Sequence, residues 1–286
     1  MENVIIRSDA LEVEISSFGA EIQSVKNYNE IEFMWCGDKN IWDGKAPILF
    51  PICGGLKEEK YIYKNKEYSI PKHGFAKHMN FDLENKEFDS AVFLLKSNED
   101  TLKCYPFDFE LRISYKVERN KLHINCNVKN MKSDPMYFSF GSHEAYSCPE
   151  GIDEYDVVFE KSETLDSYKV NGNLITDKTV RVLENNTVLP MKTDYFKTDA
   201  LIFKKTKSKS VTLAQRNGSR KIKVTFPDFP CLLFWTKPGA KYLCIEPWCG
   251  MADIEGSSFD FTKKEGIVEV VGNGEKNLYH SIEFFA

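Results

Sequence analysis

The sequence predicts an all-β protein, a large antiparallel β-sandwich made by a single domain over residues 1–286. The first reason is that apolar and polar residues alternate along several segments, which is typical of strands with one buried face. The second is that no stretch carries the sustained apolar spacing of an amphipathic helix. The third is length, because all-β folds often extend to roughly 250 residues or more as one domain.

The individual strands follow from this alternation in chain order. The segments that alternate most clearly are residues 11–15, 108–118, 122–129, 222–226 and 278–284. Arg119-Asn120-Lys121 separates two of them and predicts a hairpin turn, and Asn273-Gly274 predicts another tight turn after 267–271. We expect roughly fifteen or more strands and one or two short helices.

Composition and charge exclude several classes of protein. Apolar residues make up 42% and charged residues 28%, an ordinary balance for a globular chain. The net charge of −5 argues against a nucleic-acid or anionic-membrane partner. No apolar run is long enough to span a membrane, and no secretory signal is visible. The eight cysteines contain no C-x-x-C pair, so we interpret them as reduced thiols in a cytoplasmic protein. Nothing in the sequence indicates an oligomeric state.

Three residues are candidates for acid–base chemistry. His73 lies in Pro-Lys-His-Gly-Phe, a stiff turn that can place a side chain sharply. His143 follows an apolar strand that ends in Gly-Ser. Glu246 interrupts the apolar strand 242–248, where a carboxylate costs several kcal/mol unless it is paired or its pKa rises. A raised pKa is what a general base near neutral pH needs. For Glu246, the alternative is a strand-end carboxylate facing solvent.

The other histidines are given structural interpretations. His123 lies on the polar face of a strand and is expected at the surface, whereas His280 lies on the apolar face of the last strand and is expected in the core. His78 lies in a polar loop and is expected in solvent. His73 and His78 have no further ligand at metal spacing, so no metal site is predicted.

Five short segments, in order along the chain, resemble the aldose 1-epimerase (galactose mutarotase) family, and within it the branch of LacX-like proteins. They are Trp35–Pro51 with the following Gly54, Lys72–Ala76, Phe140–His143, Thr198–Ile202 and Cys244–Asp253. The resemblance implies a galactose mutarotase-like β-supersandwich with a sugar cleft on one face. It also implies a small sugar as the substrate, and no metal or cofactor.

The reaction implied by the resemblance is that of an isomerase, which interconverts the α and β anomers of a free aldose of the galactose or glucose class. Glu246 matches the base that takes the proton from the anomeric hydroxyl O1, and His143 matches the acid that protonates the ring oxygen. His73 matches a substrate-binding histidine, and Asp199 an aspartate that binds sugar hydroxyls. An unperturbed imidazole pKa near ~6.5 and a raised carboxyl pKa would suit these roles.

Further residues near these segments are candidates for sugar binding. Lys72 and Lys77 flank the His73 turn and could contact a sugar or a phosphate as point charges. Trp248 and Trp35 could form an apolar platform for the sugar, with core packing as the alternative for both.

The chain departs from the family pattern at two positions. The family usually carries an arginine where Gly55 stands, and the LacX-like branch a proline where Glu144 stands. We expect Glu144 either to raise the pKa of the neighbouring His143 or to face solvent.

Two alternative functions remain open. One is a non-catalytic carbohydrate-binding or sensing protein on the same fold, which Gly55 favours. The other is a hexose-6-phosphate 1-epimerase. The chain contains only 6 arginines, none of them between Ser8 and Leu111, which disfavours phosphate binding.

Overall fold

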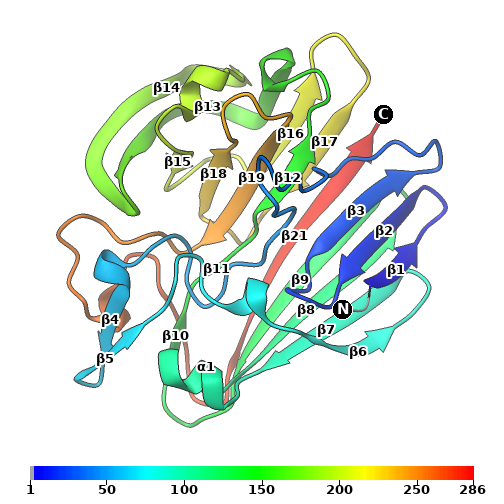
Figure 1. Ribbon diagram of the computed structural model, residues 1–286. Coiled ribbons are helices and arrows are strands. Elements are labelled where there is room, and N and C mark those ends of the chain that lie inside the picture. Colours follow the sequence, from blue (N-terminus) through cyan, green and yellow to red (C-terminus); the bar gives the residue numbers. More distant parts are fainter. Residues whose placement is uncertain (1–2) are drawn as a thin grey trace.

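The structure of the protein is a computed structural model that describes residues 3–286 and confirms the all-β fold (Figure 1). Within this range the chain forms 21 strands in five sheets, one α-helix and five short 3-10 helices. A large sheet and a smaller one form the two main layers, and the last strand, β21, runs through the middle of the large one (Figure 1).

The large sheet has nine antiparallel strands. In spatial order these are β14 (Leu174–Pro190), β13 (Tyr155–Asn171), β16 (Ser210–Gln215), β17 (Lys221–Thr225), β21 (Glu275–Phe285), β9 (Lys121–Asn130), β8 (Phe109–Glu118), β7 (Ser90–Lys96) and β6 (Asp82–Lys86). Strands β13 and β14 form a long hairpin that arches away from the rest of the sheet (Figure 1).

The second layer is a five-stranded sheet centred on β19. Its strands are β11 (Phe140–Gly141) and β12 (Glu144–Ser147), both paired with β19 (Tyr242–Cys249), followed by β18 (Cys231–Trp235) and β15 (Leu201–Phe203). Every residue of β19 is buried. Because side chains alternate along the strand, Leu243 and Ile245 join the main core while Glu246 and Trp248 face a cavity on the other side.

Smaller elements complete the fold. The remaining strands are β1 (Asn3–Arg7), β2 (Leu11–Ser16) and β3 (Ile22–Asn27) in one sheet, β4 (Lys60–Tyr63) with β5 (Lys66–Ser69), and β10 (Met136–Phe138) with β20 (Val268–Val270). The helices are α1 (Glu99–Cys104) and the 3-10 turns Lys57–Glu59, Ala76–His78, Ile152–Glu154, Thr193–Phe196 and Phe261–Lys263. One apolar core cluster extends from Val4 to Phe284 and joins both ends of the described chain.

The structure also tests the predicted turns. The hairpin between β8 and β9 is confirmed, with Glu118 opposite Lys121 and Arg119 in a left-handed conformation (φ 52°). The turn at Asn273-Gly274 is confirmed as well, although the strands on its two sides, β20 and β21, belong to different sheets.

Three further predictions concern a membrane-spanning segment, the state of the cysteines and the exposure of three histidines. No helix within residues 3–286 has the length and apolarity needed to cross a membrane. All eight cysteines are free. His280 is buried as predicted, His123 is partly exposed on β9, and His78 is exposed.

A buried ion pair supports the loop that follows β19. Lys264 Nζ lies 2.5 Å from Asp253 Oδ1, and both side chains are almost fully buried. Asp253 also accepts a hydrogen bond from the Lys57 amide through Oδ2, and its own backbone is bonded to Gly55 and Ile175. Through its side chain and backbone, Asp253 therefore connects its own loop to three other segments, at Gly55–Lys57, Ile175 and Lys264.

Candidate active site

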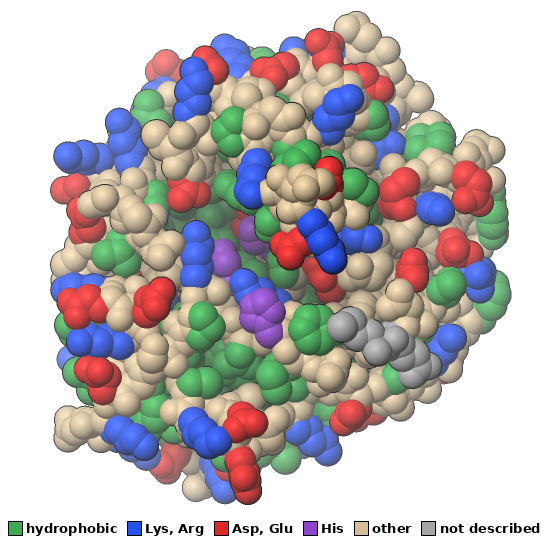
Figure 2. All heavy atoms as spheres, in the orientation of Figure 1, with side chains coloured by type: hydrophobic (Ala, Val, Ile, Leu, Met, Phe, Trp, Pro, Cys, Tyr) green, Lys and Arg blue, Asp and Glu red, His purple; other side chains and the backbone are tan. Residues whose placement is uncertain are grey.

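One face of the five-stranded sheet forms the floor of a cavity of about 740 Å³, a size typical of small-molecule sites. Figure 2 shows this hollow near the middle of the molecular face, with histidine side chains inside it. All of the site residues predicted from the sequence except Trp35 line the cavity. They are His73, His143, Glu246, Asp199, Lys72, Lys77 and Trp248.

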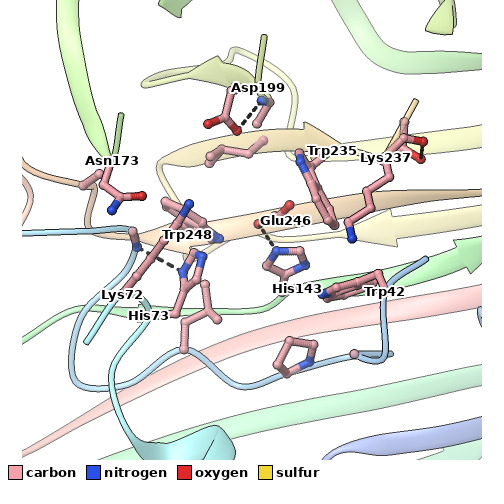
Figure 3. A pocket seen from close by; sticks show the side chains of 18 of the residues that line it. Trp42, Lys72, His73, His143, Asn173, Asp199, Trp235, Lys237, Glu246 and Trp248 are labelled. Carbon is pink, nitrogen blue, oxygen red and sulfur yellow. Dashed lines mark hydrogen bonds and ion pairs between the residues drawn. The ribbon is translucent and has the colours of Figure 1, made fainter. Parts of the chain in front are cut away.

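His143 and Glu246 face each other across two paired strands. The register places Glu144 opposite Ile245 and Gly141 opposite Trp248, so His143 lies opposite Glu246. Opposed side chains on an antiparallel pair start about 5 Å apart at Cβ, close enough for direct contact. His143 Nε2 lies 3.4 Å from Glu246 Oε2, and both side chains are buried (Figure 3).

Burial shifts the two pKa values of this pair in opposite directions. It raises the pKa of the Glu246 carboxyl well above its usual value, an effect that nearby Asp199 strengthens and the Lys72 ammonium opposes. It lowers the pKa of His143 to about 3. The prediction of a raised carboxyl pKa is thus confirmed, and the prediction of an unperturbed imidazole is wrong. The contact geometry alone would favour an ion pair, but the loss of water around both groups dominates. Both shifts favour the form of the pair in which Glu246 carries the proton and His143 is neutral.

Aromatic side chains enclose the imidazole of His143. The Trp42 ring centroid lies 5.2 Å from that of His143, and the Trp235 centroid lies 5.6 Å from it (Figure 3). Trp235 was missed in the sequence, although it falls on the same face of its strand as Leu233, which also lines the cavity. Trp35 does not line the cavity; it packs on Tyr242, so its role as a platform is not supported.

His73 is held by a strained and crowded turn. Its backbone is left-handed (φ 69°), which is uncommon for a residue other than glycine. The next residue must be glycine, because a Cβ at Gly74 would lie 2.1 Å from the Phe50 carbonyl oxygen. His73 Nδ1 accepts a hydrogen bond of 3.2 Å from the Gly54 amide, which leaves Nε2 to carry the proton. Burial lowers the His73 pKa well below its usual value, so this imidazole is a neutral donor.

We expect His73→Ala to raise KM as well as lower kcat. The loss of one neutral hydrogen bond of about 0.5–1.5 kcal/mol corresponds to a roughly 2- to 10-fold weaker interaction. Steady-state mutarotation kinetics would measure both constants. His123→Ala, on the outer sheet, is the control, and native kinetics in His73→Ala would return His73 to a purely structural role.

The sequence of this chain matches a known protein family. The sequence model of the family described as aldose 1-epimerase matches residues 2–254. This chain belongs to the aldose 1-epimerase family. The plasmid-encoded protein LacX of Lactococcus lactis subsp. lactis is 31% identical over 261 residues, which cover 86% of this chain and 87% of LacX.

Solved structures of the family agree. A galactose mutarotase related enzyme from Lactobacillus acidophilus has a TM-score of 0.95 and 32% identity, with 100% of this chain and 98% of the other covered. A galactose mutarotase-like protein from Lactobacillus casei has a TM-score of 0.94 and 27% identity, with 99% and 100% covered. The predicted family and fold are therefore confirmed.

The family usually carries an arginine where this member of the aldose 1-epimerase family has Gly55. Here another segment of the chain occupies the space beside Gly55. A Cβ built on Gly55 would lie 2.7 Å from Asn173 Cβ, at the tip of the β13–β14 hairpin. Asn173 itself lines the cavity (Figure 3). The hairpin tip is fixed there, because Asn171 Nδ2 donates to Glu255 and the Ile175 amide to the Asp253 carbonyl. No local sequence signal could have placed a hairpin tip 118 residues away beside Gly55.

Replacing Gly55 by the arginine that is usual in the family is not expected to improve sugar binding. In Gly55→Arg the new side chain must displace Asn173, so we expect weaker sugar binding and a lower melting temperature. Calorimetric titration with galactose and thermal unfolding would measure the two effects. Gly55→Arg combined with Asn173→Gly is the matched comparison, since it removes the colliding side chain; equal results for both variants would contradict the steric explanation.

A second departure from the family, Glu144, lies on the other side of the sheet from His143. It is buried and contacts Ser142 and His280 in the core. The alternation of side chains along β12 explains this, because neighbouring residues face opposite sides. Both expectations for Glu144, solvent exposure and a direct effect on the pKa of His143, are therefore wrong.

The described chain contains one group with metal-ligand chemistry, formed by His143, Cys244 and Glu246, whose donor atoms lie within 4.8 Å of one another. Metal binding requires the thiol and the carboxyl to lose their protons. Burial raises the pKa of both groups, so a metal bound here would have to displace two protons.

Proposed function

We propose that the protein is an aldose 1-epimerase that interconverts the anomers of a free aldose of the galactose or glucose class. The observation that carries the proposal is the facing pair His143–Glu246 on the floor of a sugar-sized cavity, at 3.4 Å and with opposed pKa shifts. Membership of the aldose 1-epimerase family supports the same reaction class.

The reaction uses the two protonation forms of this pair. With the proton on His143 and none on Glu246, the carboxylate takes the proton of O1 while the imidazolium protonates the ring oxygen, and the C1–O5 bond breaks. The pair is then left as Glu246-COOH and neutral His143, the form that burial favours. Rotation about C1–C2 and the reverse transfers close the ring on either face. The Lys72 ammonium, which lowers the pKa of Glu246, assists the ionised form.

The remaining cavity residues would bind the sugar. His73 offers an N–H donor, and Asp199 and Asn173 offer acceptors for hydroxyl groups. Trp248 offers an apolar face on the floor beside Glu246 (Figure 3). These groups are polar and mostly uncharged, as expected for an uncharged sugar.

A second candidate is a phosphorylated aldose. Lys72 and Lys77 line the cavity, and neither forms an ion pair with any residue in the described part of the chain. Burial and the neighbouring Lys72 lower the pKa of Lys77, and Glu21 and Asp43 offset only part of this effect. A phosphate would supply a counter-ion.

The test is mutarotation of freshly dissolved α-D-galactose, α-D-glucose and α-D-glucose 6-phosphate, followed by polarimetry with and without protein. Acceleration with the free sugars supports the proposal. Acceleration with the phosphate alone supports the second candidate. Sugar binding by calorimetry without acceleration would instead favour a carbohydrate-binding or sensing protein.

A further inference from the structure

A cluster of three buried polar side chains lies directly behind the candidate acid–base pair. Ser142 Oγ donates to Glu144 Oε1 at 2.8 Å, and His280 Nε2 lies 3.0 Å from both of these atoms. The three side chains are 1–3% exposed. We call them the Ser142–Glu144–His280 cluster. It joins the five-stranded sheet to β21, the strand in the middle of the nine-stranded sheet.

The cluster has no evident value for stability. A buried carboxylate costs several kcal/mol unless it is fully hydrogen-bonded, and buried polar groups are often no better than apolar residues of the same size. Glu144 Oε2 has no hydrogen-bond partner in the described chain, so part of this cost is not offset. On β21, both neighbours on the same face as His280, Leu278 and Ile282, are apolar. A benefit other than stability is therefore expected.

The position of the cluster indicates what that benefit is. Ser142 and Glu144 are the two residues on either side of His143. The Ser142 amide donates to the Pro247 carbonyl at 3.1 Å, and Glu144 is paired with Ile245. The two strands are thus fixed immediately before and after the point where His143 meets Glu246.

We propose that Ser142, Glu144 and His280 are positioning residues, which hold the His143 strand against β19 so that the imidazole stays opposite Glu246. This inference rests on the proposed epimerase function. None of the three faces the cavity, so they act only through the pair.

Electrostatics gives the cluster a second measurable effect. The Glu144 carboxylate raises the pKa of Glu246 through the sheet, whereas Lys72 lowers it from the cavity side. The other ionisable groups that interact with or contact Glu246 are His143, Asp199, Cys53, Tyr242 and Cys244. The singly protonated pair is lost when the pH rises through the pKa of Glu246. Glu144→Gln lowers that pKa and moves the alkaline limb of kcat/KM to lower pH, whereas Lys72→Met moves it to higher pH.

The experiment compares Glu144→Gln and Ser142→Ala with Ser281→Ala. Ser281 is the matched control, because it follows His280 in the chain and its buried hydroxyl has no hydrogen-bond partner within residues 3–286. We expect a kcat about 10-fold lower with little change in KM for the first two variants, below the ~10²-fold loss that a 1 Å misplacement can cause. The alkaline limb of kcat/KM should move to lower pH in Glu144→Gln. It should stay in place in Ser142→Ala, because that variant keeps the Glu144 carboxyl group.

A purely structural role would lower the melting temperature and leave kcat and the pH profile of the folded enzyme unchanged; that result overturns the proposal. If Glu144→Gln fails to fold, Ser142→Ala decides alone, since it removes only a hydroxyl. If the native protein accelerates no sugar, the epimerase function fails, and the positioning role is read from the ring signals of ¹⁵N-labelled histidines. Changed His143 signals in Ser142→Ala, but not in Ser281→Ala, support positioning, and unchanged signals overturn it.

Discussion

Glu246→Gln is expected to lower kcat by about 10²–10⁴-fold, the usual contribution of one positioned acid or base. The amide has nearly the same shape as the carboxyl, and its oxygen still accepts a hydrogen bond from O1, but it cannot take up the proton. Binding of galactose, measured by calorimetry, should therefore stay within a few-fold of native, while polarimetry shows the loss of rate.

The control for this variant is another buried glutamate. Glu163 is 2% exposed, accepts a hydrogen bond from the Ser208 amide, and does not line the cavity. Glu163→Gln should retain native turnover. Native turnover in Glu246→Gln would remove this carboxylate from the mechanism, whatever the family membership implies.

Lys264→Met is expected to have the largest effect on stability. Removing one partner of a buried ion pair leaves an unpaired charge and costs about 3–5 kcal/mol. Here that charge is Asp253, which holds the segments around Gly55, Lys57 and Ile175 beside the cavity. At 2–4 °C per kcal/mol for a chain of this size, the melting temperature should fall by roughly 6–20 °C. Calorimetric or circular-dichroism melting would measure it.

A double variant separates the lost ion pair from simple loss of packing. Asp253→Asn together with Lys264→Met removes both charges and keeps an oxygen for the Lys57 amide. If the two single losses in the free energy of unfolding are added, the double variant should be more stable than that sum predicts. The difference, about 0.5–3 kcal/mol, is the coupling between the two charges. Additive losses would show that the electrostatic pairing contributes little.

The parts of the fold that local patterns determine were predictable. Alternation identified strands β8, β9 and β21, and the apolar run at 242–248 marked Glu246 as a carboxylate that interrupts a strand. What the sequence could not show was the register. Only the pairing of Glu144 with Ile245 places His143 opposite Glu246, and these residues are about a hundred positions apart.

The remaining errors have one physical source, namely which side of a sheet a residue faces. Glu144 was expected to act directly on its neighbour in sequence, but adjacent strand residues point to opposite layers. Trp35 was likewise assigned a platform role without knowledge of the cavity, which it does not line, whereas Trp235 lines the cavity and was missed. The pKa of His143 depends on burial by residues distant in sequence, which no local pattern reports.

The β13–β14 hairpin has a consequence for how substrate range can change. The strands that carry Glu246 and flank His143 belong to the five-stranded sheet, whereas Asn173 reaches the cavity at the tip of a hairpin, where Asp253 and Glu255 bond to its neighbours. Insertions or substitutions at this tip alter one wall of the cavity without disturbing the core. Under the proposed function, the reaction and the choice of sugar would be encoded in separable parts of the chain, so we expect a library confined to residues 172–174 to change sugar selectivity more than turnover chemistry.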